Sequence, residues 1–335
     1  MSYLYLCEHG AVVGMEGGYF KVVHKDKSVT KIPGETLESI ALFGNNNLTI
    51  PCVQECLKRG IPVSFFSQNG SYFGRLQSTR HVNIFRQKRQ IYLSDDPRFC
   101  LSFTRKILLA KTKNQMTVLR RYMRTTQKDI SGAIDFMRKN ISKIETAPNI
   151  DVCKGYEGLI AREYFNCLSE LVPREFKFKG RNKQPPLDAF NSMLSLGYTL
   201  LMYEIYGEIE NAGLNPYAGL MHKDRERHPT LASDLMEEWR AVLVDTVVLS
   251  LVMGKEISSE EFWKEEETGG VFLSYDAMKI FLKKYELKMR QETKYLEAAQ
   301  MGFSSYRKAI RYQIQRFVQM IMNQNIEEYK PIIIR

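Results

Sequence analysis

Two hydrophobic patterns divide the chain. Up to about residue 78, short runs of β-branched and aromatic residues alternate with turn residues, which is typical of strands. These runs are Tyr3–Cys7, Val12–Met15, Tyr19–His24, Val29–Ile32, Ser39–Leu42 and Val63–Phe66. The segment Gln68–Ser71 follows the last run and predicts a hairpin turn. One helix interrupts the strands, because Pro51 suits a first helical turn and Gly60 is a typical helix stop.

From about residue 80 onward, apolar residues recur at steps of three and four, which is the period of amphipathic helices. The helices expected from this pattern are Phe99–Arg124, Asp151–Leu171, Leu187–Ala212, Leu231–Val252, Tyr275–Lys284 and Ser304–Gln324. The chain is therefore expected to be an α+β protein, with a small N-terminal β-rich domain followed by a larger all-α catalytic domain. The expected boundaries are 1–80 for the β-rich domain, 81–98 for a linker and basic helix start, and 99–335 for the helical domain.

Composition limits the class of protein. With 335 residues and 44% hydrophobic residues, the chain can form sizeable cores. Its six cysteines complete no zinc-binding pattern and are expected to be free thiols in a reducing cytoplasm. The first residues do not resemble a signal peptide, and the longest apolar stretch, Ala241–Gly254, is too short to span a bilayer. A cytoplasmic protein without a membrane partner is expected.

Positive charge is concentrated in one segment. The formal net charge is +10, and the segment from Arg75 to Lys128 holds fourteen Lys and Arg residues but only two acids. Charge runs are usually solvated helix faces. Here few acids are present to neutralise the surface, and such a surface is suited to phosphate binding.

Four residues far apart in the sequence are candidates for metal chemistry: Glu157, His222, Asp234 and Glu237. Glu157 lies on an otherwise apolar helix stripe, where an ionised carboxylate needs a cation or a cap. Asp234 and Glu237 share one helix face and repel each other, which a bound cation would relieve. Each residue alone has an ordinary explanation as a cap, a core histidine or a solvated acid. Together, one imidazole and several carboxylates suit Mn²⁺ or Mg²⁺ better than a structural zinc.

The surroundings of these residues resemble the CRISPR-associated adaptation integrase family, the "Cas one" proteins. The segment Glu157–Phe165 is similar to the family's Glu-Gly-x-x-Ala-Arg-x-Tyr-Phe helix, and Gly213–His222 to its Gly-Leu-x-Pro…Gly-x-x-His turn. The segment Gly180–Tyr198 resembles the arginine-proline loop and the helix after it. The segment Ser233–Asp245 resembles the Asp-Leu-x-Glu-x-Phe-Arg helix, with Trp239 where Phe is usual.

The resemblance implies a metal-dependent DNA endonuclease or integrase of CRISPR adaptation. Glu157, His222 and Glu237 would hold the Mn²⁺ or Mg²⁺ ion, and Asp234 would be an accessory acid. The 3′-hydroxyl of a short DNA fragment would attack a phosphodiester at the CRISPR repeat boundary. The DNA backbone is expected to contact a set of basic residues: Arg75, Arg86, Lys88, Arg89, Arg120, Arg121, Arg124 and Arg181.

The expected partners are double-stranded DNA with 3′-hydroxyl ends, CRISPR repeat DNA and a small second CRISPR-associated adaptation protein. A homodimer formed through the β-rich module is also implied. Two other functions remain open. One is a stand-alone nuclease for branched DNA or RNA, which would use water as the nucleophile. The other is a non-catalytic DNA-binding scaffold in which the acids are merely solvated.

Overall fold

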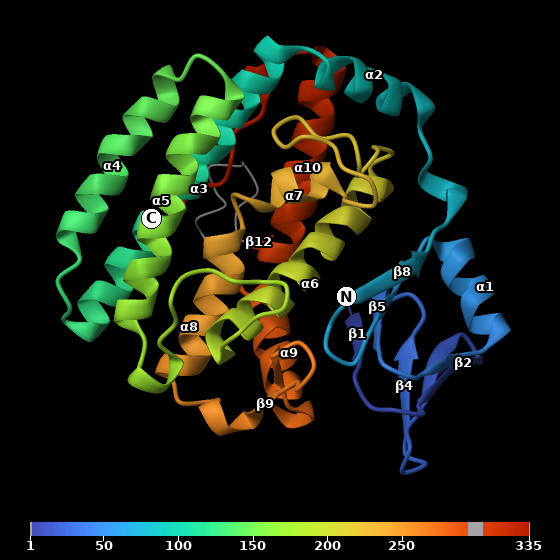
Figure 1. Cartoon of the computed structure of the whole chain (residues 1–335). Helices are drawn as coiled ribbons and strands as arrows, with labels where there is room; N and C mark the ends of the chain where they lie inside the picture. Colours follow the sequence, from blue (N-terminus) through green and yellow to red (C-terminus); the bar gives the residue numbers. More distant parts are fainter. Residues whose placement is uncertain (1, 294–303, 335) are drawn as a thin grey trace. The chain divides into compact units, whose positions relative to one another are not determined.

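The chain folds into two compact units, Met1–Val82 and Asn83–Arg335 (Figure 1). The structure is a computed structural model that describes residues 2–293 and 304–334. Strands dominate the first unit and helices dominate the second. The α+β class predicted from the sequence is confirmed. The segment 81–98, expected to be a linker and a helix start, contains the helix α2 (Ile84–Ser94).

The first unit contains two four-stranded sheets. One has the order β1-β5-β7-β8, in which β1, β5 and β7 are parallel and β8 is antiparallel. Its strands are Ser2–Leu6, Leu37–Phe43, Val63–Phe66 and Tyr72–Leu76. The other has the order β4-β3-β2-β6. Its strands are Val29–Pro33, Tyr19–Val23, Val12–Glu16 and Asn47–Leu48.

The helix α1 (Ile50–Arg59) begins and ends as the sequence predicts. Thr49 caps it by accepting a hydrogen bond from the backbone N–H of Cys52, and Pro51 lies in its first turn. Gly60 ends it with φ of +72°, a left-handed conformation that glycine adopts without strain. The helix buries Cys52 and Cys56 in a core that includes residues of both sheets.

The second unit is built mainly from helices. They are α2, α3 (Pro97–Thr126), α4 (Ser131–Thr146), α5 (Ile150–Leu171), α6 (Ala189–Asn211), α7 (Thr230–Met236), α8 (Thr246–Met253), α9 (Tyr275–Arg290) and α10 (Tyr306–Asn323). Two short antiparallel ribbons accompany them, so this unit is not purely helical. They are β9 (Phe262–Lys264) with β10 (Val271–Leu273), and β11 (Glu292–Thr293) with β12 (Ser304–Ser305).

The sequence pattern did not predict α2 and α4. In α2, Ile84, Phe85 and Tyr92 are exposed, so its apolar residues do not mark a single buried face. At the start of α4, Ile130 makes no side-chain capping bond, so the usual sequence signal for a helix start is missing. Both helices therefore lacked one of the two signals on which the prediction depended.

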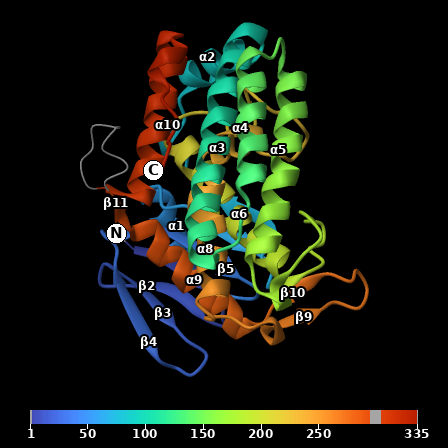
Figure 2. The same ribbon diagram turned by 90° about the vertical axis from the view of Figure 1, so that its left-hand side faces the viewer.

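The helices α3, α4 and α5 pack side by side (Figures 1 and 2). Asp96 caps α3 by accepting from the backbone N–H groups of Arg98 and Phe99, and Asn149 caps α5 by accepting from Val152. The packing of α3 against α5 brings Lys111 on α3 to Glu157 on α5.

The helix predicted for Leu231–Val252 is divided in the structure. The helix α7 ends at Met236, a turn follows, and a π-helical segment, Ala241–Asp245, precedes α8. Single π turns inside helices frequently occur at functional sites, because they redirect the side chains around them. Glu237, Arg240 and Asp245 lie in or next to this irregular stretch.

The C-terminal tail is attached to α3 by Asn114. Its buried side chain donates to the carbonyl groups of Glu238 and Ile332, each at 2.9 Å. It also accepts from the backbone N–H of Ile334 at 2.9 Å. One amide side chain therefore connects α3, the turn after α7 and the tail.

Two further sequence expectations bear on the fold. All six cysteines are free thiols, as expected. Among residues 2–293 and 304–334, no helix has both the length and the apolar character needed to cross a membrane.

We predict that Asn114→Ala lowers the free energy of unfolding of the second unit by roughly 2–4 kcal/mol, because three buried backbone groups lose their partner. Urea unfolding followed by tryptophan fluorescence measures this unit, since both tryptophans, Trp239 and Trp263, lie in it. Lys113→Ala changes an exposed neighbour on the same helix and is the control. Equal midpoints for both variants would contradict the prediction.

Candidate metal centre

Two of the predicted ligands share a single cation. Lys111 Nζ lies 2.5 Å from Glu157 Oε1 and 2.8 Å from Glu237 Oε2. The side chains of Lys111 and Glu237 are 9% and 4% exposed, whereas that of Glu157 is 25% exposed. Arg240 contacts the other oxygen of Glu237 at 3.2 Å. The structure therefore brings Glu157 and Glu237 together around a buried positive charge.

These cations determine the ionisation of the site. Burial alone would raise the pKa of Glu237, but Arg240 and Lys111 outweigh it and lower the pKa to about 2. A positive charge on His222 would act on the pKa of Glu237 in the same direction. Burial alone would also lower the pKa of Lys111, and the Glu157 and Glu237 carboxylates raise it instead. Glu237 is thus a carboxylate and Lys111 an ammonium at neutral pH.

Asp234 organises the turn that carries His222. It is fully buried, and its Oδ2 accepts from the backbone N–H groups of Leu220 at 2.8 Å and Met221 at 2.9 Å. Its Oδ1 accepts from the backbone N–H of His222 at 3.1 Å and lies 2.6 Å from His222 Nδ1. Since a carboxylate only accepts, Nδ1 carries the proton and Nε2 is left as the basic nitrogen. A histidine fixed in this way can bind a metal through Nε2.

Gly219 makes this arrangement possible. A Cβ atom at this position would lie 2.4 Å from Thr230 Cγ2 and 2.9 Å from Asp234 Oδ2. Any side chain here would push the turn away from α7. The glycine therefore allows the backbone to approach the Asp234 carboxylate closely enough to donate to it.

The structure forms two pairs from the four predicted residues. Glu157 is next to Glu237, and His222 is next to Asp234. Within residues 2–293 and 304–334, no three acidic, histidine or cysteine side chains converge as a ready metal site. Glu157 lines one cavity, of about 590 Å³, and His222 lines another, of about 510 Å³.

The residues present fit a hard divalent cation. Two carboxylates from different helices already converge on one positive charge, and Glu237 Oε2 is buried without a well-aligned hydrogen bond among the described residues. The His222 imidazole, whose Nδ1 is bonded to Asp234, lies on the turn that Asp234 holds against α7. Oxygen donors with one nitrogen suit Mn²⁺ or Mg²⁺.

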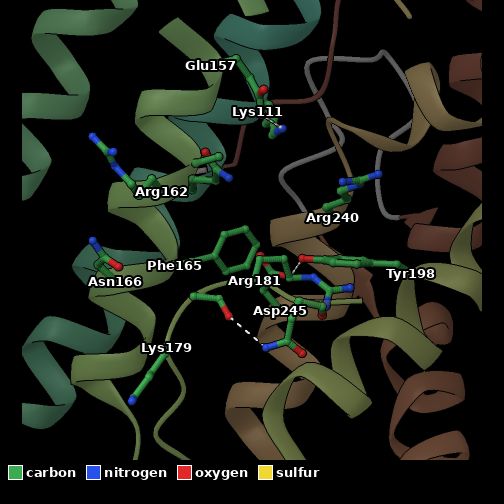
Figure 3. A pocket seen from close by; sticks show the side chains of 14 residues that line it. Lys111, Glu157, Arg162, Phe165, Asn166, Lys179, Arg181, Tyr198, Arg240 and Asp245 are labelled. Atoms are coloured by element: carbon green, nitrogen blue, oxygen red, sulfur yellow. Dashed lines mark hydrogen bonds and ion pairs between the residues drawn. The ribbon is translucent and has the colours of Figure 1, made fainter. Parts of the chain in front are cut away.

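The cavity beside Glu157 has a cationic lining. Figure 3 shows Glu157 and Lys111 at one end, with Arg181, Tyr198 and Asp245 further along. Other lining residues are Gln115, Ala161, Arg162, Phe165, Asn166, Lys179, Gly180, Asn182 and Arg240. Five of the lining residues are Lys or Arg, whereas Glu157 and Asp245 are the acids of this lining. Such a lining favours an anionic ligand.

A buried acid lies deep in this cavity. Asp245 accepts hydrogen bonds from the Tyr164 hydroxyl at 2.6 Å and from the Tyr198 hydroxyl at 2.5 Å. Burial raises the pKa of Asp245 to about 6, although both tyrosine bonds oppose this effect. The guanidinium groups of Arg240 and Arg181 lie over the Tyr198 ring, at 5.0 Å and 5.4 Å from its centre. The network fixes both arginines beside the cavity.

The predicted DNA-contacting residues have different surroundings. Arg86 donates to the Ala212 carbonyl at 2.7 Å. Arg181 donates to Asn191 Oδ1 at 2.9 Å and Ser195 Oγ at 3.1 Å. The remaining six are exposed or half-buried: Arg75 on β8, Lys88 and Arg89 on α2, and Arg120, Arg121 and Arg124 on α3. Arg86 and Arg181 are thus already bonded within the chain.

Sequence reasoning did not single out Lys111 or Arg240 as parts of this site. Lys111 was included only in the basic segment, where nothing distinguished it from its neighbours. Its position among apolar residues of α3 was the available signal, because an isolated lysine on a buried face needs an acidic partner. Arg240 and Asp245 lay within the resembling blocks but were given no role.

The comparisons with known proteins agree with the fold and identify the family. The sequence model of the family "CRISPR associated protein Cas1" matches residues 4–287. The chain is 35% identical to a CRISPR-associated endonuclease Cas1 of Mycobacterium tuberculosis strain CDC 1551 over 321 residues, covering 96% of this chain and 94% of that one. The chain therefore belongs to the CRISPR-associated Cas1 family, and it is an enzyme of the nuclease class.

Two solved structures share the fold at lower identity. A casposase bound to an integration product has a TM-score of 0.84 and 20% identity, covering 97% of this chain and 92% of that one. A chain of a Cas6-RT-Cas1–Cas2 complex has a TM-score of 0.83 and 24% identity. The similarity covers 98% of this chain but 36% of that one.

We predict that the stability of the wild type relative to an Asp245→Asn variant falls by about 1 kcal/mol between pH 5 and pH 8. The pKa of Asp245 is raised from 3.8 to about 6, so its stabilising contribution is complete below pH 3.8 and is lost as the pH rises through 6. Asparagine does not titrate. Urea unfolding of both proteins without metal at the two pH values measures the difference, and a constant difference would contradict the raised pKa.

Proposed function

We propose that this chain is a metal-dependent DNA integrase of CRISPR adaptation, which joins 3′-hydroxyl ends of short DNA fragments into a CRISPR array by transesterification. The observations that carry the proposal are the convergence of Glu157 and Glu237 on one cation and a histidine, His222, whose Nδ1 is fixed by Asp234. Membership of the Cas1 family supports the CRISPR role. The casposase with the same fold is bound to an integration product, which supports joining.

In this proposal Glu157, Glu237 and His222 Nε2 hold Mn²⁺ or Mg²⁺. Bound there, the metal would supply Lewis-acid polarisation of a phosphoryl oxygen. Asp234 acts through His222, since it fixes the imidazole tautomer and the turn. Arg240 keeps Glu237 ionised and ready to accept a cation. His222 must be neutral to bind metal, so acid should reduce activity.

The DNA would be held mainly by charge. The exposed and half-buried arginines at the end of α3, Arg120, Arg121 and Arg124, suit contacts to the phosphate backbone without sequence reading. The cationic cavity beside Glu157 would admit a strand end next to the metal. A chain of a Cas6-RT-Cas1–Cas2 complex shares this fold, which supports a small second adaptation protein as partner. A homodimer is part of the same proposal.

We predict that Glu157→Gln, Glu237→Gln and His222→Ala each reduce Mn²⁺-dependent joining of a labelled fragment to supercoiled repeat DNA by more than about 100-fold, because each removes a metal ligand. Asp234→Asn should lose about 10–100-fold, because it leaves the ligands in place but releases the histidine. Glu145→Gln changes an exposed acid on α4 and is the control.

Product analysis separates joining from hydrolysis. Gel bands longer than the fragment report transesterification, whereas free ends alone would favour a nuclease that uses water. Full activity in any ligand variant would remove that residue from the metal site. If all variants bind DNA but the wild type neither joins nor cuts it with Mn²⁺, the enzymatic proposal is wrong.

We predict that replacing Arg120, Arg121 and Arg124 together by alanine weakens DNA binding. The slope of the logarithm of the binding constant against the logarithm of the salt concentration should become shallower by up to about 3. Each lost phosphate contact releases about one fewer counterion. Fluorescence anisotropy at several salt concentrations measures the slope. A matched triple variant of exposed lysines, Lys255, Lys264 and Lys283, should retain the wild-type slope. Identical slopes in all three proteins would place the DNA elsewhere.

A further inference from the structure

The proposed metal position already contains a positive charge from the protein itself. Lys111 Nζ is within 2.8 Å of one oxygen of each carboxylate ligand. Lysines paired with acids usually neutralise one partner at the surface, where the interaction contributes little. Lys111 instead neutralises two carboxylates from α5 and from the end of α7, and its side chain is almost completely buried.

A metal ion and this ammonium cannot occupy the site together. Mg²⁺ binds carboxylate oxygens at about 2.0–2.1 Å, so an ion shared by Glu157 and Glu237 needs the space between their oxygens. The ammonium fills that space now. A divalent cation beside an ammonium would also be strongly repelled at such short range.

The ammonium has a route out of the site. Lys111 lines the cavity of about 590 Å³, and Figure 3 shows it next to Glu157 at the edge of that space. A lysine head group on a flexible four-carbon stem can rotate into such a cavity without movement of α3. The cavity lining is cationic, so the displaced ammonium would be accommodated best when an anionic strand end is also there.

We propose that Lys111 is an internal competitor for the metal: its ammonium holds Glu157 and Glu237 in place until Mn²⁺ or Mg²⁺ displaces it into the adjoining cavity. This inference rests on the ligand set of the proposed function. In the metal-free protein, Lys111 keeps the two carboxylates paired and oriented. It also weakens metal binding, because each bound ion must first break two buried ion pairs. Phosphate entering the cavity would then favour the displaced lysine and so favour metal binding.

The test is Mn²⁺ binding to the full chain, measured by titration with electron paramagnetic resonance detection of free Mn²⁺. Lys111→Met keeps the length of the side chain but removes the charge, and we expect its Kd for Mn²⁺ to be at least about tenfold lower than that of the wild type. Lys113→Met changes an exposed lysine on the same helix and should bind as the wild type does. An unchanged or higher Kd in Lys111→Met would overturn the proposal.

Thermal unfolding provides the second measurement. Without metal, Lys111→Met should melt below the wild type, because two carboxylates lose their partner. Saturating Mn²⁺ should raise its Tm by more than it raises that of the wild type. If Lys111→Met and Lys111→Gln both remain unfolded in saturating Mn²⁺, no metal can take the place of the ammonium, and the proposal is wrong.

Failure of the proposed function gives a different result. If the wild type binds no Mn²⁺ and Glu157→Gln and Glu237→Gln behave identically to it, the metal site itself is wrong. If those two variants lose binding that the wild type has, while Lys111→Met gains none, only the competition is wrong.

Discussion

Two carboxylates that converge in a largely buried site need a cation, and three segments of the second unit meet to provide one. Glu157 comes from α5 and Glu237 from the end of α7, and Lys111 on α3 lies between them. An unpaired charge at the buried Glu237 would be costly, and Lys111 and Arg240 hold the pKa of that carboxyl well below its usual range. The helix pair α3–α5 therefore has a polar constraint on its register as well as an apolar one. The same two acids make a site that a stronger cation can use.

Asp234 meets a second requirement, which is a fixed position for His222. Three backbone N–H groups and one imidazole nitrogen surround its carboxylate, so the buried charge is fully hydrogen-bonded. The charge of the glutamate pair and the charge of Asp234 are therefore stabilised in different ways. The glutamates are compensated by side-chain cations, Lys111 for both and Arg240 for Glu237, whereas Asp234 is compensated mainly by the backbone, which cannot leave. For this reason Asp234 is better suited to orienting a ligand than to binding the ion itself.

Much of the fold follows from local sequence signals, and part of the site does not. Strands, the hairpin at Gln68–Ser71 and the cap of α1 were predictable, because turn residues and capping residues act on their immediate neighbours. The division of the helix predicted for Leu231–Val252 was not, since a π turn depends on tertiary contacts. The role of Lys111 was hidden for a similar reason. Its partners lie 46 and 126 positions away, and only the packing of α3 against α5 and against the π-helical segment after α7 brings the three together.

The π segment connects the metal position to the cationic cavity. Asp245, its last residue, is held by hydroxyl groups from α5 and α6, so the point at which α8 resumes a regular helical path is fixed by two other helices. Arg240, immediately before the segment, contacts Glu237 on one side and the Tyr198 ring on the other. A regular helix would give these side chains different directions. The arginine that keeps Glu237 ionised therefore also lines the cavity that would receive the DNA end. Through Arg240, the charge of a proposed metal ligand and the position of the DNA would depend on the same side chain.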